Sequence, residues 1–111
     1  PMIEMIGGGM DALTIGDPRR LDTDVGPVID DGAKRTLDEH IDWLKKNAKK
    51  VRLLALPEAA AKGSFVTPAC YELKSLRQLK DENFGPVLHV IRFPADGLAD
   101  VVRDINDTGF G

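Results

Sequence analysis

Apolar residues recur at helical spacing near the start of the chain, at Met2, Ile3, Met5, Ile6, Met10 and Leu13. This spacing predicts a helix with one apolar face. Gly7-Gly8-Gly9 interrupts the pattern, and each glycine costs a helix about 1 kcal/mol relative to alanine. We therefore expect a weak helix that depends on packing for its stability. Gly16-Asp17-Pro18 predicts the turn that follows it.

Two further helices are predicted later in the chain. The apolar stripe of the first is formed by Ala33, Leu37, Ile41, Leu44 and Ala48. Asp30 or Asp31 suits its N-cap, and the lysines at its far end complement the helix dipole. The second is expected to be capped by Asp96, and its apolar face carries Leu98, Val101, Val102 and Ile105.

Strands are predicted at residues 51–56, 65–73 and 87–93, with a short helix capped by Ser75 before the last of them. Pro68 suggests that the second strand lies at an edge or contains a bend. The nearly continuous apolar run at 87–93 indicates burial on both faces, as in a parallel sheet under helices. The order of helix, helix, strand, strand, helical turn, strand and helix predicts an α/β fold in one domain over residues 1–111.

Residues 17–32 are expected to form an ordered loop rich in aspartate, with Asp17, Asp22, Asp24, Asp30 and Asp31. Several acids in one loop raise the question of a calcium site. The D-x-D-x-D-G run and the distant glutamate of an EF-hand are absent. We interpret these residues as turn-forming and helix-capping aspartates.

Composition narrows the class of protein. The chain has 111 residues, 42% of them apolar, and a net charge of −3. This suits one folded domain and argues against a general binder of nucleic acid or of anionic membranes, which is expected to be basic. A single cysteine excludes an internal disulfide framework and favours a reducing compartment, so we expect a cytoplasmic protein. Because the chain starts at Pro1 in an apolar pattern, we expect it to be a piece of a longer protein.

Few residues suggest chemistry by themselves. Cys70 lies in an apolar segment, which favours a buried structural thiol over a nucleophile. His40 and His89 are too few and too far apart for a metal motif, and we interpret each as a structural histidine. The five basic residues between Lys45 and Arg52 could bind phosphate, but a solvated helix end is the simpler interpretation.

The segment from Asp81 to Pro86 is more informative. It combines a short acidic stretch, an aromatic residue and a Gly-Pro pair immediately before a predicted strand. Gly85-Pro86 imposes a sharp, fixed entry into that strand. Such an entry can hold a carboxylate of the acidic stretch and an aromatic face at the sheet edge, where they suit a ribose and a flat heteroaromatic ring. A plain turn with a packed Phe84 is the alternative.

Five segments of the chain resemble motifs of the aldehyde dehydrogenase superfamily, in the family's order. Glu82-Asn83-Phe84-Gly85-Pro86-Val87 is similar to its E-x-F-G-P-V motif. The other segments are residues 15–18, 23–29, 63–68 and 105–111. Within the superfamily, residues 22–30 and 84–90 are most similar to the pyrroline-5-carboxylate dehydrogenase part of the bifunctional proline utilisation A enzymes.

The resemblance implies a partial aldehyde dehydrogenase catalytic domain, an α/β structure with a mostly parallel sheet flanked by helices, and NAD as the cofactor. It implies that Glu82 hydrogen-bonds the nicotinamide ribose and that Phe84 packs beside the nicotinamide ring. Gly85 and Pro86 would fix this loop. Asn83 stands where the family more often has an aliphatic residue, so the local packing is less certain than the backbone motif.

The resemblance also implies what the chain lacks. The family's nucleophilic cysteine, its glutamate base and its Rossmann portion all precede the matched segment, and Cys70 does not align with the nucleophile. In the parent enzyme a cysteine thiolate would attack the aldehyde, here glutamate semialdehyde, hydride would pass to NAD, and water would release the acid. The chain alone is therefore expected to be inactive, with no catalytic residue and no metal site of its own.

The expected partners are the remainder of the parent dehydrogenase and, through exposed strand edges, a second copy of the chain. Two alternatives remain open. One is a non-enzymatic α/β module kept for binding or oligomerisation, against which the retained Glu82 and Phe84 argue. The other is an unrelated small enzyme that uses Cys70, for which rapid alkylation of that thiol is expected.

Overall fold

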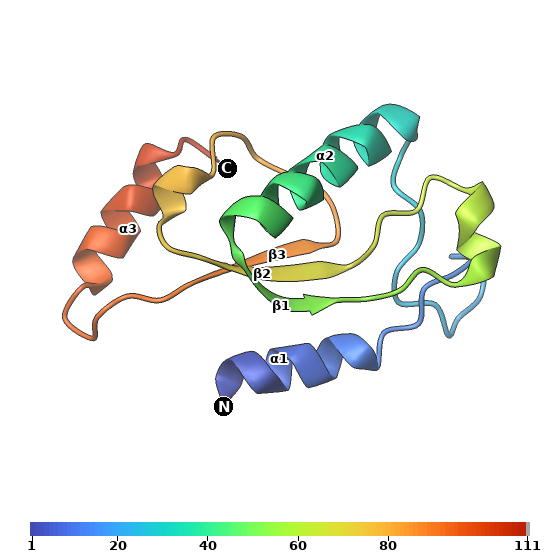
Figure 1. The fold of residues 1–111 in the computed structure, drawn as a ribbon, viewed down its shortest axis with the longest axis horizontal. Helices are drawn as coiled ribbons and strands as arrows, with labels where there is room; N and C mark the ends of the chain where they lie inside the picture. The colour runs from blue at the N-terminus through green and yellow to red at the C-terminus, as the bar shows by residue number, and fades with distance from the viewer. Residues whose placement is uncertain (111) are drawn as a thin grey trace.

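The computed structural model describes residues 1–110, and it places helices on both sides of a small sheet (Figure 1). The helices are α1 (Met2–Asp11), α2 (Asp31–Asn47) and α3 (Leu98–Asp107), and the strands are β1 (Lys49–Leu53), β2 (Ala69–Leu73) and β3 (Val87–Ile91). Two short 3-10 helices, η1 (Glu58–Lys62) and η2 (Leu76–Gln78), lie in the connections. The predicted α/β class is confirmed, and η1 is the one addition to the expected order. Gly111, the last residue of the motif at 105–111, lies outside the described residues.

The sheet is mixed, with the strand order β1-β2-β3. Strand β1 pairs with β2 in the antiparallel sense, whereas β2 and β3 are parallel, which corrects the expectation of a mostly parallel sheet. A parallel pair needs a crossover of about a dozen residues, and the segment between β2 and β3 supplies one. Pro68 does not mark an edge, because it immediately precedes the central strand, where its carbonyl accepts a hydrogen bond from the Leu54 N–H at 3.0 Å.

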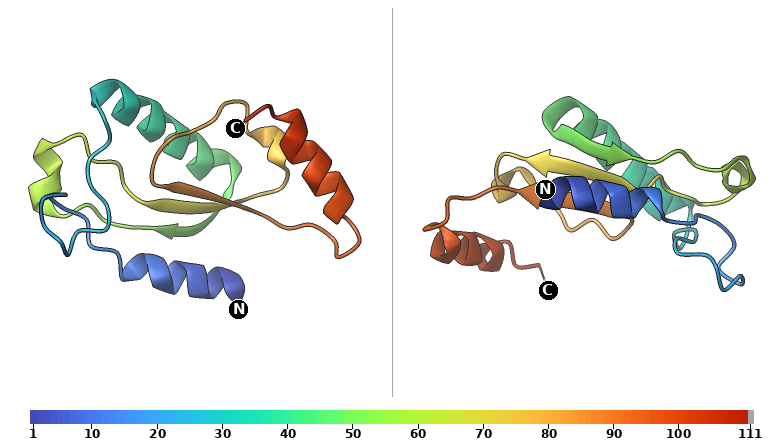
Figure 2. Two further views of the ribbon diagram at one scale, coloured as in Figure 1. Left: turned by 180° about the vertical axis from the view of Figure 1, so that it is seen from behind. Right: turned by 90° about the horizontal axis from the view of Figure 1, so that it is seen from below.

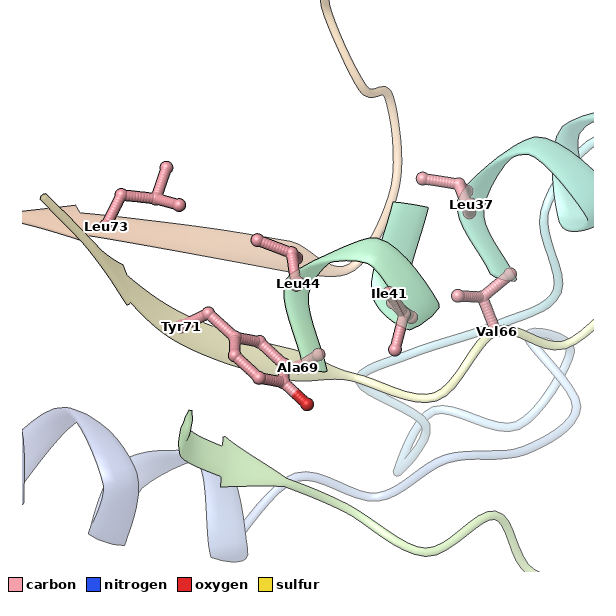
Figure 3. Close-up of a cluster of buried hydrophobic side chains, with 7 residues drawn as sticks. All are labelled: Leu37, Ile41, Leu44, Val66, Ala69, Tyr71 and Leu73. Carbon is pink, nitrogen blue, oxygen red and sulfur yellow. The ribbon is translucent and has the colours of Figure 1, made fainter. Parts of the chain in front are cut away.

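Helix α2 packs its apolar stripe over β2 and forms the buried core (Figure 3). The stripe on the helix consists of Leu37, Ile41 and Leu44, each at most 4% exposed. Alternate residues of β2 face it, because successive side chains of a strand point to opposite sides. These residues are Ala69, Tyr71 and Leu73, and Val66 joins them. The core is thus made by one helix face and one strand face.

The ends of α2 and η2 follow the sequence predictions. The Asp30 carboxylate accepts a hydrogen bond from the Ala33 N–H at 2.7 Å, which confirms it as the N-cap of α2. Ser75 caps η2 by accepting from the Arg77 N–H at 3.2 Å. The side chain of Gln78 accepts in turn from the Ser75 N–H, which completes a capping box.

Helix α1 lies along β1 on the side of the sheet away from α2, as Figures 1 and 2 show. It runs without interruption through the three glycines. The side chain of Arg52 on β1 reaches the helix, where it forms an ion pair with Asp11 at 2.7 Å and donates a hydrogen bond to the Gly7 carbonyl at 3.4 Å. A Cβ at Gly7 would lie only 3.5 Å from the Arg52 Nε. Packing therefore supports this helix, as predicted.

Strand β3 and helix α3 are less buried than their apolar sequences suggest. Leu88 of β3 is 46% exposed, so the predicted burial on both faces is wrong. Helix α3 has no buried residue and stands beside η2 at one end of the molecule (Figure 1). The physical reason for the exposure of both elements is the same: nothing within residues 1–110 covers their outer sides. The N-cap of α3 is Gly97 rather than the predicted Asp96, because a turn closed by the Gly97 N–H and the Pro94 carbonyl precedes the helix. None of the described helices is long and apolar enough to cross a bilayer.

The loop before β3 touches the core at Gly85. A Cβ built on Gly85 would lie within 2.9 Å of the Leu37 Cδ2 atom, well inside contact distance. Leu37 is 2% exposed and is held by the core, so it has little room to yield. This position therefore requires glycine for a close approach between loop and helix.

We predict that Gly85→Ala lowers the free energy of unfolding by about 1–3 kcal/mol, because the added methyl group overpacks Leu37. Gly9→Ala is the matched control, because a Cβ there meets no atom within 4 Å and α1 is helical at that position. It should stabilise the chain by about 0.5–1 kcal/mol. Urea unfolding of both variants checks the opposite signs. Equal effects at the two positions would contradict the close approach.

A second prediction concerns Tyr71, whose buried hydroxyl has no hydrogen-bond partner within the described residues. Removing an unpaired polar group from a core costs little, so Tyr71→Phe should leave the free energy of unfolding unchanged or raise it by about 1 kcal/mol. Tyr71→Ala should cost about 3–5 kcal/mol through loss of the ring. Urea unfolding again provides the measurement. A loss above about 1 kcal/mol in the phenylalanine variant would reveal a partner for the hydroxyl.

Candidate functional site

The loop from Asp81 to Pro86 joins η2 to β3 and is tied to the sheet at its end. The Pro86 carbonyl accepts a hydrogen bond from the Ala69 N–H of β2 at 3.0 Å. Within the loop, the Asn83 side-chain amide donates to the Asp81 carbonyl at 2.9 Å. The fixed entry into β3 that the Gly-Pro pair predicts is therefore present, and the loop carries one internal support of its own.

Two of the four predicted cofactor-binding residues, Glu82 and Phe84, are exposed on this loop. Phe84 is 78% exposed, so the alternative of a packed Phe84 is wrong. The other two, Gly85 and Pro86, are held by Leu37 and by the sheet. The motif is thus divided into a pair that anchors the loop and a pair that is accessible to a ligand.

The accessible pair fits one end of a nicotinamide dinucleotide. A carboxylate offers two acceptor oxygens, which suits the hydroxyls of a ribose. The face of a phenyl ring can pack against a flat heteroaromatic ring. Glu82 and Phe84 are two positions apart on a loop whose end is anchored, so both groups are presented from one support. Sites for the rest of such a cofactor do not follow from these residues.

A hollow of about 260 Å³ lies beside the loop, between it and α2. His40 and Trp43 line it from the helix, and Asp81 and Asn83 line it from the loop. Leu37, which touches Gly85, is one helical turn before His40 on α2. One side of α2 therefore faces the whole loop.

His40 on α2 and His89 on β3 form a hydrogen bond between their Nε2 atoms at 2.8 Å. The His40 ring also stacks on Trp43, with the ring centroids 5.9 Å apart. Burial lowers the pKa of His40, and burial together with the charge of His40 lowers the pKa of His89 to about 4. Near neutral pH both rings are therefore uncharged, and one donates while the other accepts.

This histidine pair is the feature that sequence reasoning missed. The two residues are 49 positions apart, and each was interpreted separately as a structural histidine. The only signal in the sequence is that each borders an apolar segment, His40 next to Ile41 and His89 within the last strand. Their contact depends on how α2 crosses β3, which the spacing of residues along the chain does not encode.

Cys70 lies in the central strand and has no exposed surface. Burial raises its pKa, because a low-polarity environment disfavours the thiolate. The interpretation as a buried structural cysteine is confirmed. A nucleophile needs the opposite environment, with a lowered pKa and access to the substrate.

The aspartates of the loop at 17–32 serve local structure, as predicted. Hydrogen bonds from Arg19 lower the pKa of Asp17 to about 2. The Asp24 carboxylate accepts from the Thr14 N–H at 2.8 Å and so ties the two sides of the loop together. Among residues 1–110, no group of three or more histidine, cysteine or acidic side chains is arranged to hold a metal ion.

The basic run at the end of α2 is partly neutralised. Lys45 pairs with Asp42 at 2.8 Å, and Lys49 lies 3.9 Å from the Glu72 carboxylate. Both lysine side chains are largely in solvent, at 49% and 77% exposure. These contacts agree with a solvated helix end rather than a phosphate site.

Comparison with known proteins places the whole chain in one family. The pattern of the aldehyde dehydrogenase family matches residues 2–111. The bifunctional protein PutA of Salmonella typhimurium is 37% identical over 114 residues, which cover 98% of this chain and 9% of PutA. The succinate-semialdehyde dehydrogenase [NADP(+)] GabD of Escherichia coli is 33% identical over 111 residues, covering 97% of this chain and 22% of GabD. In a solved structure, a mutant of Bradyrhizobium japonicum proline utilization A (PutA) matches with a TM-score of 0.89 and 45% identity over 99% of this chain and 11% of that chain.

The chain therefore spans about a tenth of the length of its PutA relatives and about a fifth of GabD. Members of the matched family use NAD(P). The resemblance drawn from the five motifs is confirmed, because the family match and the structural match both extend over nearly all of the chain. The chain belongs to the aldehyde dehydrogenase family, as a segment of the dehydrogenase domain that is similar to the corresponding part of proline utilization A.

Proposed function

We propose that this chain is part of an NAD-dependent dehydrogenase that oxidises glutamate semialdehyde, the open form of pyrroline-5-carboxylate, in proline catabolism. Similarity to PutA supports the substrate, and the family's use of NAD(P) supports the cofactor. The observation that carries the proposal is the exposure of Glu82 and Phe84 on a loop anchored by Gly85 and Pro86. A degenerate scaffold has no need for this arrangement.

The role of the loop is to bind and orient the nicotinamide end of the cofactor. Glu82 accepts hydrogen bonds from the ribose hydroxyls, and a charged acceptor binds these more strongly than a neutral one. Phe84 packs beside the nicotinamide ring and restricts its position. When bound, NAD accepts the hydride that leaves the aldehyde carbon. Gly85 and Pro86 keep both side chains in place by fixing the end of the loop.

The nucleophile belongs elsewhere in the parent enzyme. Cys70 is buried in the central strand, and its raised pKa disfavours the reactive thiolate. We therefore propose that this chain supplies cofactor binding and that, without the rest of the dehydrogenase, it does not oxidise aldehydes. We expect the parent to work in the cytoplasm, where reducing conditions keep thiols free.

We also propose that the remainder of the dehydrogenase covers α3 and the edges of the sheet. Leu98, Val102 and Ile105 on α3 are 58%, 48% and 50% exposed. Single exposed apolar residues are ordinary, but a helix that buries none of its residues and presents an apolar stripe indicates a missing partner surface. Without that surface, the edge strands β1 and β3 are expected to pair with a second copy of the chain.

We predict that Glu82→Gln in the parent dehydrogenase lowers kcat/KM for NAD by roughly 10–100-fold, because a charge-assisted hydrogen bond contributes about 1.5–3 kcal/mol. Asp81→Asn is the matched control, since it removes a carboxylate from the same exposed loop one residue earlier. The control should change this ratio less than about twofold. Steady-state kinetics with varied NAD provide the measurement. Equal losses in both variants would contradict a specific role for Glu82.

A further prediction tests the covering of α3. In the isolated chain, Val102→Ala should change the free energy of unfolding by less than about 0.5 kcal/mol, because the side chain is exposed. In the parent dehydrogenase the same change should cost about 2 kcal/mol if another segment buries this position. Val66→Ala is the control: Val66 is 1% exposed, so the change should destabilise both proteins. A harmless Val102→Ala in the parent would argue against a covered α3.

A further inference from the structure

We propose that His40 and His89 act as a positioning pair, which holds the cofactor loop in its binding position while at least one imidazole is neutral and releases it when both imidazoles are protonated. The pair would thus make NAD binding depend on pH. The inference rests on the proposed function of Glu82 and Phe84, because it concerns the support of the loop that carries them. It adds two residues to that site which do not touch the cofactor.

The first argument is geometric. Helix α2 makes two contacts one helical turn apart, one with the end of the loop, where Leu37 meets Gly85, and one with the strand that follows, where His40 meets His89. The two contacts bracket the junction of the loop with β3, which begins at Val87. The position of this junction on α2 therefore sets where the loop leaves the sheet. Within residues 1–110, the histidine contact is the side-chain hydrogen bond that joins α2 to β3.

The second argument concerns the kind of contact. The apolar contact between Leu37 and Gly85 is non-directional, so it limits how closely the loop approaches the helix but does not fix the orientation of the strand. The bond between the Nε2 atoms at 2.8 Å opposes separation and also fixes direction. The stacking of His40 on Trp43 restrains the His40 ring, so that the hydrogen bond ties β3 to a fixed group on α2. The pair is thus suited to hold the strand and loop against the helix.

The third argument is the proton count. A neutral pair contains one N–H and one free lone pair at the two facing nitrogens, which is what the hydrogen bond requires. A first proton can enter at the Nδ1 of the donor ring, so the bond persists between an imidazolium and a neutral imidazole. A second proton removes the last facing lone pair and leaves two charged donors facing each other in a half-buried site, so the bond is lost. Protonation of both rings is therefore a switch from an attractive contact to a repulsive one.

The surroundings offer little compensation for such a charge. On the loop side, Lys80 and Asp81 line the hollow next to His40, with opposite charges. On the sheet, Tyr71 is the register partner of His89. None of these groups is hydrogen-bonded to either imidazole among the described residues, and the charge that acts on His89 is that of His40. The charge on His40 is therefore the main electrostatic influence on the protonation of His89.

The sign of the pH effect follows. The folded state keeps the pKa of His89 at about 4, below the ordinary value of 6.5. The charge of His40 contributes to this shift, so the pKa of about 4 describes the second proton, and the contact breaks only as the pH falls towards that value. The stabilising contribution of a histidine with a depressed pKa is complete above about pH 6.5 and is lost as the pH falls through the folded value. NAD binding should weaken in the same direction.

Two variants of His89 separate the hydrogen bond from its titration. In His89→Gln the amide can still bond to His40 but does not titrate, whereas in His89→Leu no bond can form at any pH. In the parent dehydrogenase at about pH 8, KM for NAD in the leucine variant should be about fivefold above wild type, and the glutamine variant should match wild type. As the pH falls to about 4.5, wild type should move from the glutamine value towards the leucine value. The difference between the two variants should appear in KM for NAD, with kcat unchanged.

Arg35→Gln is the control, because Arg35 is exposed on α2 and the change also removes a basic side chain. Its KM should follow wild type at every pH. The proposal is overturned if both His89 variants share the wild-type pH profile, or if the leucine variant loses kcat with KM unchanged. It is also overturned if the glutamine variant behaves like leucine, since the bond would then not be the cause.

A second readout is independent of catalysis. Trp43 is the single tryptophan of the chain, and its ring stacks on His40. A protonated imidazole quenches a stacked indole, so the emission of the chain should fall in one step on acidification. His40→Gln should abolish the step, because the stacked imidazole is then absent, and Arg35→Gln should leave it unchanged. Absence of the step in wild type would overturn the proposal.

The two readouts distinguish the possible failures. If the emission step follows the prediction but KM for NAD does not differ between the two His89 variants, the positioning role is wrong and the proposed function stands. If the wild-type parent shows no NAD-dependent aldehyde oxidation, the proposed function fails and the positioning role fails with it, while the emission step still reports on the pair.

Discussion

The burial of one face of α2 against one face of β2 is the contact on which the rest of the structure depends. Leu37, Ile41 and Leu44 lose nearly all of their exposed surface to this contact, at about 2 kcal/mol for each side chain. Other elements add to the core from its margins. Since the chain is short and its edges are open, residues 1–110 contain no second cluster of similar burial that could take over this role.

The candidate site takes its geometry from this core rather than from the loop itself. Gly85 approaches Leu37, a core residue, and the absence of a side chain at Gly85 is what permits the approach. One turn further along the same helix, His40 bonds to His89 in the strand that continues the loop. The exposed Glu82 and Phe84 are therefore presented by a rigid element, which is the arrangement expected of a binding loop.

Burial is uneven over the surface of the chain, as expected for a segment that spans a small part of its relatives. One side of the sheet is packed under α2, whereas β3 is only partly covered and α3 buries no residue. The chain spans about a tenth of its PutA relatives. Apolar surface that a larger domain would bury remains exposed in such a segment, because burial is a property of the whole domain and not of the local sequence.

Periodicity and turn chemistry were sufficient to predict the elements, since helix and strand spacing, the Asp30 cap and the Ser75 capping box are all local features. Five short motifs in the family's order were sufficient to predict the family, because the residues of each motif are close together in the chain. Burial of β3 was predicted wrongly, because it depends on neighbours outside the local sequence. The cap of α3 was misplaced by one residue, because a turn closed by the Gly97 N–H and the Pro94 carbonyl precedes the helix. The contact of Leu37 with Gly85 and the bond between His40 and His89 were decided by the tertiary structure alone, since each joins residues about 50 positions apart through the way in which α2 crosses the sheet.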